Sequence, residues 1–322
     1  MMQSAYPTAG TESIDALLRD ELAASLQVAE NNAVILRHLL RSDDHSVFSD
    51  EVIARVRGMV ADVARQLVIA LARAAGYDDA HGWAEEAAPE LAVALAGNQA
   101  LIAHFHALAL EYQLTCRLER ERSIDPVLSP LLQAQVASAL PEVATVAMHF
   151  LTAQARFCQT QRRMEMPLAE LPGDFFHAAM LTMRAQAGQD PAMDECAASA
   201  EETLRAEHEN HAARVDLAAG LLGEMGNNAA AALSIEDAGV ALFLSALALG
   251  AGQDRDAAMM STTDGQMGRL VLALAACGLK RDALVTQFAA IHPDVELPEG
   301  LEALHADRAA ALLGQSAGTA GH

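Results

Sequence analysis

Apolar residues recur at every third or fourth position along most of the chain, which is the period of an α-helix with one buried face. From Val52 to Leu67 the apolar stripe advances by four, three, four and four residues, and a similar stripe runs from Leu101 to Tyr112. No segment shows the sustained alternation of apolar and polar residues that marks a half-buried strand. The sequence therefore predicts an all-α fold, an antiparallel helical bundle followed by stacked helical pairs of the HEAT type.

Proline and glycine residues divide this pattern into separate helices. Pro126, Pro141, Pro172 and Pro191 each precede a periodic apolar run, and proline is well tolerated in the first turn of a helix. The predicted helices cover residues 13–41, 49–75, 84–96, 99–121, 126–138, 141–165, 172–187, 191–222, 235–250, 254–261, 265–277, 281–291 and 299–313.

The strongest internal break in the sequence lies at Gly188–Pro191, although the break at Ser123–Pro126 competes with it. We place the domain boundary at the later break. This choice gives an N-terminal helical bundle over residues 1–188, a C-terminal helical stack over residues 189–313, and a flexible tail rich in Gly, Ala and Ser over residues 314–322.

One short motif occurs twice, since the segment Gly252–Ala257 returns 26 residues later as Gly278–Ala283. In both copies the glycine can end one helix in a left-handed conformation, and an aspartate can complement the dipole of the next helix. Such helix–turn–helix units are typical of solenoids, but a solenoid normally requires about three or more copies. A plain bundle therefore stays open as the alternative.

The charge balance excludes two classes of partner. The chain of 322 residues carries 43 acidic and 21 basic side chains, for a formal charge of -22. Such a surface repels phosphate backbones and anionic headgroups, so we expect neither nucleic-acid binding nor membrane binding. Hydrophobic residues make up 52% of the chain and the mean hydropathy is +0.15, which is too apolar for a disordered acidic chain.

The cellular compartment follows from segments that the sequence lacks. Its longest uncharged apolar run, Ala238–Gly252, has 15 residues, whereas a helix needs ~20 to span a bilayer. The first ten residues lack the basic and apolar regions of a secretory signal. The four cysteines are far apart, with no paired spacing for zinc or a redox dithiol. We therefore expect reduced thiols and a cytoplasmic location.

The best candidate for a metal site is the segment Glu207–His211 in the predicted helix 191–222. His208 and His211 are three residues apart, so both rings project from one face, and Glu207 lies about one turn before His211. Zinc would need at least one more ligand from another helix. Apolar residues share this helical face, so the alternative is a pair of imidazoles where two helices pack.

Other catalytic and metal-binding motifs are weaker. His104 and His106 are two residues apart, so about 200° of helix rotation separates their rings, and we expect His106 to point to solvent. Only Glu302–His305 matches the Glu-x-x-His motif, of which a ferritin-like dimetal site requires two. The sequence contains neither a Gly-x-Ser-x-Gly elbow nor a dinucleotide-binding glycine fingerprint.

His38 is a candidate for phosphotransfer. The apolar residues of the predicted first helix gather on the opposite face, which leaves the His38 ring exposed between Arg37 and Arg41. Imidazole is nucleophilic, and flanking arginines can neutralise phosphoryl oxygens. Exposed histidines are also common on solvated helix faces, so an ordinary surface role stays open as the alternative.

Arg156, Arg162 and Arg163 form the one locally basic segment of this acidic chain. Clustered guanidinium groups can bind a carboxylate or phosphate of a partner, so these three residues are candidates for partner binding. The alternative is ion pairing with the abundant acids of the chain itself, and surface pairs of that kind are common and individually weak.

Five segments carry a resemblance to a known family: Leu128–Leu132, Ala153–Phe157, Gln161–Glu165, Pro167–Pro172 and Gly278–Pro293. Together they resemble an uncharacterised, all-helical alphaproteobacterial family known only as a domain of unknown function, over residues 45–295. The resemblance implies a cytoplasmic helical protein with HEAT-like stacking. It brings no activity, ligand or functional residue to this chain.

We therefore expect a non-enzymatic helical scaffold or regulatory protein that acts through protein–protein interaction and needs no cofactor. The apolar face of the first predicted helix also allows a homodimer. Two alternatives belong to other classes. One is an enzyme that binds a metal or small ligand at Glu207, His208 and His211, and the other is a protein that transfers a phosphoryl group through His38.

Overall fold

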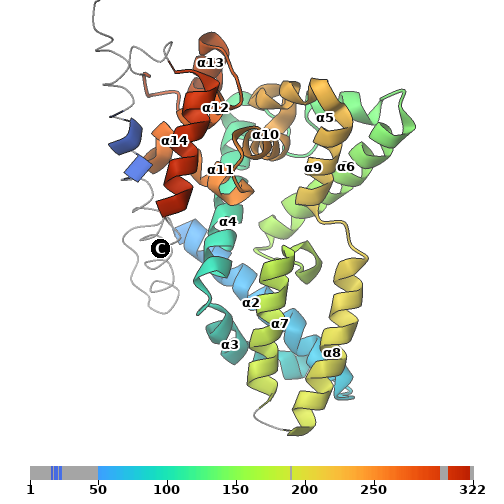
Figure 1. Cartoon of the computed structure of the whole chain (residues 1–322). Coiled ribbons are helices and arrows are strands. Elements are labelled where there is room, and N and C mark those ends of the chain that lie inside the picture. Colours follow the sequence, from blue (N-terminus) through green and yellow to red (C-terminus); the bar gives the residue numbers. More distant parts are fainter. Residues whose placement is uncertain are drawn as a thin grey trace, which may run out of the picture. The chain divides into compact units, whose positions relative to one another are not determined.

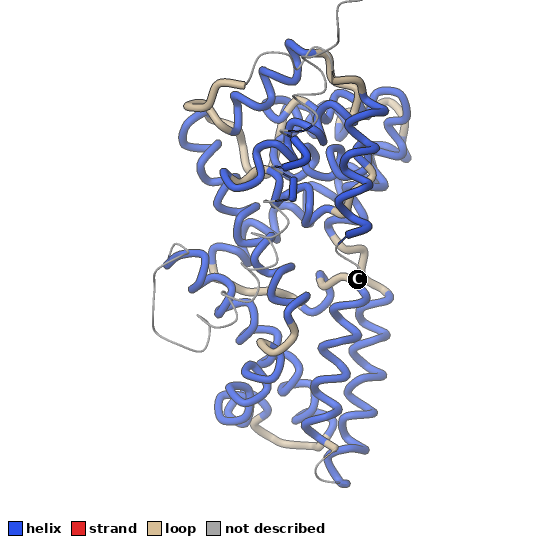
Figure 2. The backbone as a smooth tube through the Cα atoms, turned by 60° about the vertical axis from the view of Figure 1, so that its left-hand side comes forward, coloured by secondary structure: helices blue, strands red, loops and turns tan. Residues whose placement is uncertain are grey.

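The computed structural model describes residues 16, 18–20, 22–23, 50–188, 191–297 and 304–319. Within these residues it contains thirteen α-helices and three short 3₁₀ helices, and it contains no strand (Figures 1 and 2). The predicted all-α fold is confirmed. HEAT-like stacking is a finer statement and stays a prediction. Most of the predicted helix 13–41, including His38, lies outside the described residues.

The helices form two compact units. Of the described residues, the larger unit contains 50–128, 132–188 and 191–224, and the smaller unit contains 129–131, 225–297, 304–319 and the short pieces before residue 24. The division therefore falls near residue 224 and not at the predicted boundary of residue 188. The reason is that α7 (Gly173–Ala187) and α8 (Pro191–Glu209) lie side by side and both pack on α2 (Asp50–Ala74), so Gly188 separates two helices of one core (Figure 1).

The larger unit is built around α2. The predicted apolar stripe of this helix is buried, and the exposed fraction is 0% at Val56, Met59, Val63 and Leu67. The helices that pack on α2 include α3 (Ala80–Leu95), α4 (Gln99–Arg122), α7 and α8. The remaining elements up to residue 225 are α5 (Pro130–Val136), α6 (Pro141–Arg162), η1 (Leu168–Glu170) and α9 (Arg214–Met225).

Side-chain caps fix where α3 and α4 begin. Asp79 Oδ1 accepts a hydrogen bond from Gly82 N at 2.8 Å, and Asn98 Oδ1 accepts one from Leu101 N at 3.1 Å. Each bond satisfies a first-turn amide that has no partner inside its own helix. Because Asp79 caps α3, this helix begins at Ala80, four residues before the predicted start.

The linker between α6 and η1 lies directly against α2. Asp62 Oδ2 accepts a hydrogen bond from Met166 N at 3.0 Å. Gln66 bonds both the linker and the first residue of η1, because its Nε2 donates to Met166 O at 2.8 Å and its Oε1 accepts from Leu168 N at 3.0 Å. These bonds satisfy backbone groups that no helix pairs, so one face of α2 holds a loop where its other faces hold helices.

The smaller unit contains the repeated motif, and the structure confirms the helix–turn–helix geometry in both copies. Gly252 and Gly278 have φ angles of +63° and +79°, in the left-handed region that favours glycine. Asp254 caps the following helix, since its Oδ1 accepts a hydrogen bond from Ala257 N at 2.7 Å. The elements of this unit are η2 (Gly226–Leu233), α10 (Ile235–Ala251), α11 (Arg255–Ser261), η3 (Asp264–Gln266), α12 (Met267–Ala276), α13 (Arg281–Ile291) and α14 (Ala306–Thr319).

The predicted tail begins inside α14. This helix starts at Ala306 and continues to Thr319, so residues 314–319 are helical where we expected a flexible tail, and residues 320–322 lie outside the described residues. Leu312 and Leu313 are buried and anchor the helix. Extending an anchored helix costs little, because each added residue gains one backbone hydrogen bond.

The apolar run Ala238–Gly252 forms most of α10, and nearly all of that helix is buried. Among the described helices, none has by itself the length and hydropathy of a membrane span. Two bent pairs reach that hydropathy only when taken together, namely α3 with α4 at a bend of 101° and α10 with α11 at a bend of 108°.

His104 and His106 are both only 5% exposed, so the expectation that His106 points to solvent is wrong. The reason is that α4 is covered around most of its circumference between Leu101 and Ala109. The His104 ring stacks on Phe175, with 4.8 Å between ring centroids. Burial lowers the pKa of His106 to about 4, because the imidazolium form would lose its hydration.

The close approach of the linker to α2 predicts a strict requirement for glycine at position 58. A Cβ atom there would lie 2.6 Å from the carbonyl oxygen of Met164. We expect Gly58→Ala to lower the free energy of unfolding by about 1–3 kcal/mol. The matched control is Gly223→Ala in α9, where a Cβ meets nothing within 4 Å and alanine should stabilise the helix by ~0.5–1 kcal/mol. Urea unfolding measures both changes, and equal effects would contradict this assignment.

Because His106 is buried, we expect the free energy of unfolding to depend on pH in the acid range. Below pH ~6.5 the unfolded chain binds a proton at His106, whereas the folded chain binds it only near pH 4. Stability should therefore fall as the pH drops from ~6.5 to ~4, by roughly 3 kcal/mol for this group. Chemical unfolding across this range should show a smaller loss in His106→Leu. His149→Leu, which removes an exposed histidine, should keep the wild-type slope.

Candidate functional site

The predicted helix 191–222 is interrupted at the candidate metal site. α8 ends at Glu209, residues 210–213 form a turn, and α9 begins at Arg214. His208 therefore lies in the last turn of α8, whereas His211 lies in the turn that follows. The two rings do not project from one helical face, so the geometry that motivated the metal site is wrong.

His208 holds the end of α8 against the segment between η1 and α7. Its ring stacks on Phe176 with 4.1 Å between centroids, and its Nε2 is 2.8 Å from the carbonyl oxygen of Leu171. The ring nitrogen on that side must donate to the carbonyl. His208 thus acts as a packing and hydrogen-bonding residue, which is the alternative that the sequence left open.

Glu170 explains why the helix breaks after Glu209. Its Oε1 accepts a hydrogen bond from His211 Nε2 at 2.9 Å, and its Oε2 accepts one from the backbone N of Arg214 at 2.9 Å. The second bond caps the first turn of α9, where a negative charge also complements the helix dipole. Residues 210–213 contain neither Gly nor Pro, so this tertiary contact overrides a weak local preference.

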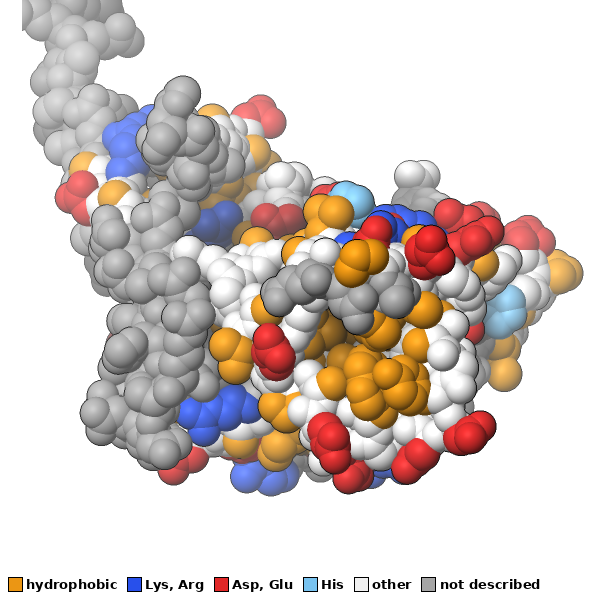
Figure 3. Space-filling view, turned by 90° about the horizontal axis from the view of Figure 1, so that it is seen from below, with side chains coloured by type: hydrophobic (Ala, Val, Ile, Leu, Met, Phe, Trp, Pro, Cys, Tyr) orange, Lys and Arg blue, Asp and Glu red, His pale blue; other side chains and the backbone are white. Residues whose placement is uncertain are grey.

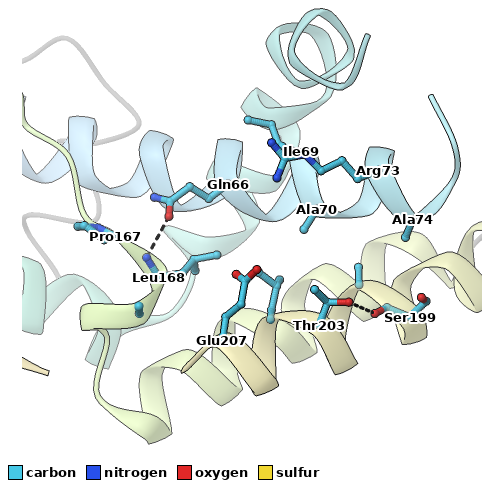
Figure 4. Close-up of a pocket in the computed structure, with 13 residues that line it drawn as sticks. Gln66, Ile69, Ala70, Arg73, Ala74, Pro167, Leu168, Ser199, Thr203 and Glu207 are labelled. Atoms are coloured by element: carbon cyan, nitrogen blue, oxygen red, sulfur yellow. Dashed lines mark hydrogen bonds between the residues drawn. The ribbon is translucent and has the colours of Figure 1, made fainter. Parts of the chain in front are cut away.

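The Glu207 side chain lies in surroundings that differ from those of His208 and of His211. Its exposed side chain points into a groove of about 520 Å³ between α2 and α8, whose walls also include Gln66, Arg73 and Thr203 (Figure 4). Among the residues that the structure describes, no group of three or more His, Cys, Asp or Glu side chains could hold a metal ion. Glu207, His208 and His211 are therefore not brought together as ligands.

A buried ion pair, which sequence reasoning missed, lies close to these histidines. Arg214 Nη1 and Nη2 donate to the two carboxylate oxygens of Glu111 at 2.7 and 3.0 Å. Arg214 Nη1 also donates to Gln154 Oε1 at 3.1 Å, and the guanidinium carbon lies 3.8 Å from the ring centroid of Phe157. The side chains of Arg214 and Glu111 are only 4% and 1% exposed. The two hydrogen bonds of this bidentate pair replace the hydration that both charged groups lose on burial.

The ion pair and Gln154 together join three helices, because Glu111 lies on α4, Gln154 on α6 and Arg214 on α9. The local sequence gives one weak signal, because Glu111 is an isolated acid among apolar residues of α4. A lone charge on a buried face indicates that a partner of opposite charge must come from elsewhere. The sequence does not indicate which residue supplies that charge, because Arg214 is 103 residues away.

The three arginines predicted for partner binding are all exposed and lie on or just after the last turns of α6. Arg156 and Arg163 line one cavity, whereas Arg162 lies outside that cavity. The hydrogen bond between Arg162 and Tyr112 raises the pKa of Arg162, and Arg163 Nη1 lies 4.0 Å from Glu165 Oε2. The structure therefore separates the three arginines, with Arg162 paired inside the chain.

Two thiols are too deeply placed to act as nucleophiles at neutral pH. Burial raises the pKa of Cys158 to about 11 and the pKa of Cys277 to about 12. The thiolate is the reactive form, so both residues stay protonated under ordinary conditions. Cys158 fills space in the core, as free cysteines often do, and Cys277 is half-buried.

The clearest apolar surface feature is a hollow of about 230 Å³ on the larger unit, which we call the Trp83 hollow. Residues of α2, α3, α7 and α8 form it, and the half-buried Trp83 stacks on Tyr77 at 5.2 Å. Figure 3 shows the apolar side chains gathered there, with acidic side chains around them. The main lining residues are Leu71, Trp83, Leu91, Met183, Gln186 and Met193.

The polar groups of the Trp83 hollow favour a cationic, hydrogen-bond-donating partner. Glu90 lines the hollow, and Glu86 is exposed one turn before it on the same helix, which carries neither Lys nor Arg. Gln186 Oε1 is buried and accepts no hydrogen bond in the structure. A buried acceptor without a donor is unfavourable, and a partner's N–H group would satisfy it.

Known proteins give no match to this chain. No family model matches it, and no curated protein or solved structure matches it. The resemblance of segments such as Pro167–Pro172 to an all-helical alphaproteobacterial family therefore stays an expectation from the sequence, and function has to be argued from the geometry.

The buried ion pair predicts a large cost for removing one charge. We expect Glu111→Ala to lower the free energy of unfolding by ~3–5 kcal/mol, because it leaves the guanidinium of Arg214 buried without its counterion. The matched control is Glu165→Ala, whose partner Arg163 is exposed, and here we expect a change below ~1 kcal/mol. Thermal and urea unfolding measure both variants.

A double variant separates the charge effect from simple loss of packing. In Glu111→Leu with Arg214→Met both charges are replaced by apolar side chains, and such replacements of buried pairs are often close to neutral. We expect this variant to regain most of the stability that Glu111→Ala loses. If Glu111→Ala is as mild as Glu165→Ala, the pair does not carry the role assigned to it.

Proposed function

We propose that this chain is a non-enzymatic helical scaffold or regulatory protein that acts through protein–protein interaction, and that its Trp83 hollow is the docking site. The observation that carries the proposal is the apolar hollow with acidic side chains around it (Figure 3). Exposed apolar patches with a polar rim are typical of interaction sites, and Trp is enriched among the residues that contribute most to binding energy.

The surroundings of the hollow define one kind of partner, an amphipathic helix with basic residues beside its apolar face. Its apolar side chains would fill the space between Trp83, Leu91 and Met183. Its Lys or Arg residues would face Glu86 and Glu90, and complementary charge speeds association and excludes acidic competitors. A helix that enters a groove in this way is a common mode of peptide recognition.

The non-enzymatic character of the proposal is supported by how the charged side chains are used. Two convergences of acid and base in the larger unit are Glu111 with Arg214 and Glu170 with His211, and in both the groups bond each other. Groups in such pairs stabilise the fold and are not free to move protons onto a substrate. A cytoplasmic location and the absence of a cofactor are part of the same proposal.

Trp83 gives a direct test, because it is the one tryptophan of the chain and lies inside the hollow. The probe is a synthetic Leu/Lys peptide of about 15 residues, long enough to form an amphipathic helix when bound. We expect a saturable change in tryptophan emission. A peptide of the same composition with its apolar face scrambled, and a Leu/Glu peptide of the same pattern, should bind at least ~10-fold more weakly.

Two matched pairs of variants locate the binding. Ala87→Glu places bulk and charge in the hollow and should abolish the emission change, whereas Val93→Glu on the exposed side of the same helix should not. Glu90→Lys should weaken binding of the basic peptide, whereas Glu224→Lys on α9 should have no effect. Circular dichroism checks that each variant is folded. If Leu/Glu binds as well as Leu/Lys, or if Ala87→Glu behaves like Val93→Glu, the docking site is elsewhere.

A further inference from the structure

A second cavity in the larger unit lies apart from the Trp83 hollow and shares none of its lining residues. It has a volume of about 240 Å³ and is bounded by α4, by the end of α6, by the η1 region and by the start of α9, and we call it the α6–α9 cavity. Pockets for drug-sized ligands occupy ~300–1,000 Å³, so this cavity suits a smaller molecule.

Apolar groups make up much of the cavity wall, and they include Leu108, Phe157, Met166, Pro172 and Val215. The guanidinium of Arg214 also forms part of this wall, but it is bonded to Glu111 and Gln154 and its carbon lies over the Phe157 ring. Its charge is therefore already compensated inside the protein. A wall of this kind binds the hydrocarbon part of a ligand, because burying it removes apolar surface from water.

A polar stripe on α6 forms one edge of the cavity. Arg156, Gln159, Thr160 and Arg163 all line it, at the i, i+3, i+4 and i+7 spacing of one helical face. Both arginines are exposed, and the Arg163 side chain is 72% exposed. Arg156 has no ion-pair partner among the described residues. The ion pair of Arg163 is long, because its Nη1 lies 4.0 Å from Glu165 Oε2.

Two acidic residues also line the cavity, and neither forms an ion pair with Arg156 or Arg163 in the described part of the chain. The Glu170 carboxylate is occupied, because it accepts hydrogen bonds from His211 and from the backbone N of Arg214. Asp216 is exposed in the first turn of α9. Arg156 is therefore bonded to no carboxylate of the cavity, and Arg163 lies 4.0 Å from Glu165, so guanidinium N–H groups stay available at this edge, on a chain with a formal charge of -22.

We propose that the α6–α9 cavity binds a small molecule with an apolar body and one anionic group, such as a medium-chain carboxylate. The apolar body lies against Phe157, Met166 and Val215, and the carboxylate accepts hydrogen bonds from Arg156 and Arg163. Guanidinium groups form strong, directional bonds to carboxylates. The acidic remainder of the surface repels anions, so this edge is where an anionic ligand gains most from reaching the protein.

The test uses three probes that share one hydrocarbon chain and differ in the head group, namely octanoate, octan-1-ol and octylammonium. Ligand-detected NMR titration of the full chain at low ionic strength measures each affinity. We expect octanoate to bind most tightly, octan-1-ol to bind at least ~5-fold more weakly, and octylammonium to bind most weakly. Added salt should weaken octanoate more than octan-1-ol, because only the first carries a charge.

Variants assign the two parts of the ligand to the two parts of the cavity. Arg156→Gln with Arg163→Gln should weaken octanoate by ~10-fold and leave octan-1-ol unchanged. Arg162→Gln is the matched control, since it removes an exposed arginine of the same helix that does not line the cavity. Ala213→Leu should fill part of the space and weaken octanoate and octan-1-ol alike. If this variant does not fold, Val215→Phe serves the same purpose.

Three outcomes would overturn the proposal. The first is octylammonium binding as tightly as octanoate, which would mean that Asp216 and Glu170 dominate the charge at the edge. The second is equal loss of octanoate binding in Arg162→Gln and in the double variant, which would indicate non-specific attraction to arginine. The third is the absence of saturable binding by octanoate. None of these measurements depends on Trp83, so the proposed docking site is tested separately.

Discussion

The larger unit depends on a buried carboxylate and a buried guanidinium, neither of which would be stable in the core without the other. Glu111 on α4 and Arg214 on α9 are almost completely removed from water, and each is stable there only because the other is present. Gln154 and Phe157 on α6 complete the surroundings of the guanidinium. One electrostatic requirement therefore fixes how three helices meet, and it does so with a direction that apolar packing lacks.

This arrangement decides which charges remain for binding. The core uses Arg214, and the turn after α8 uses Glu170 and His211, so these groups build the scaffold. Exposed charges of opposite sign lie beside two concave surfaces. Glu86 and Glu90 of α3 lie at the Trp83 hollow, and Arg156 and Arg163 lie at the edge of the α6–α9 cavity. Both proposals follow from this placement, since each concave surface combines an apolar wall with charged side chains at its edge.

Features that depend on neighbours within one or two turns could be predicted. The stripe from Val52 to Leu67 predicted the buried face of α2, and the glycines at 252 and 278 predicted two helix ends. The break after Glu209 could not be predicted, because it arises from Glu170, which lies far away in the sequence. The predicted metal site failed for the same reason. Its spacing was sound for a continuous helix, but the helix is not continuous.

The sequence by itself determined that the described chain is helical, where most helices run and which side of each is apolar, because these properties follow from contacts three or four residues apart. Only the tertiary structure decided which faces meet, why His106 is buried, and where the two units divide. A periodic apolar pattern shows that one face of a helix is buried, but it does not show which element covers that face. A charge such as Glu111 receives its meaning from a partner 103 residues away, which periodicity does not record.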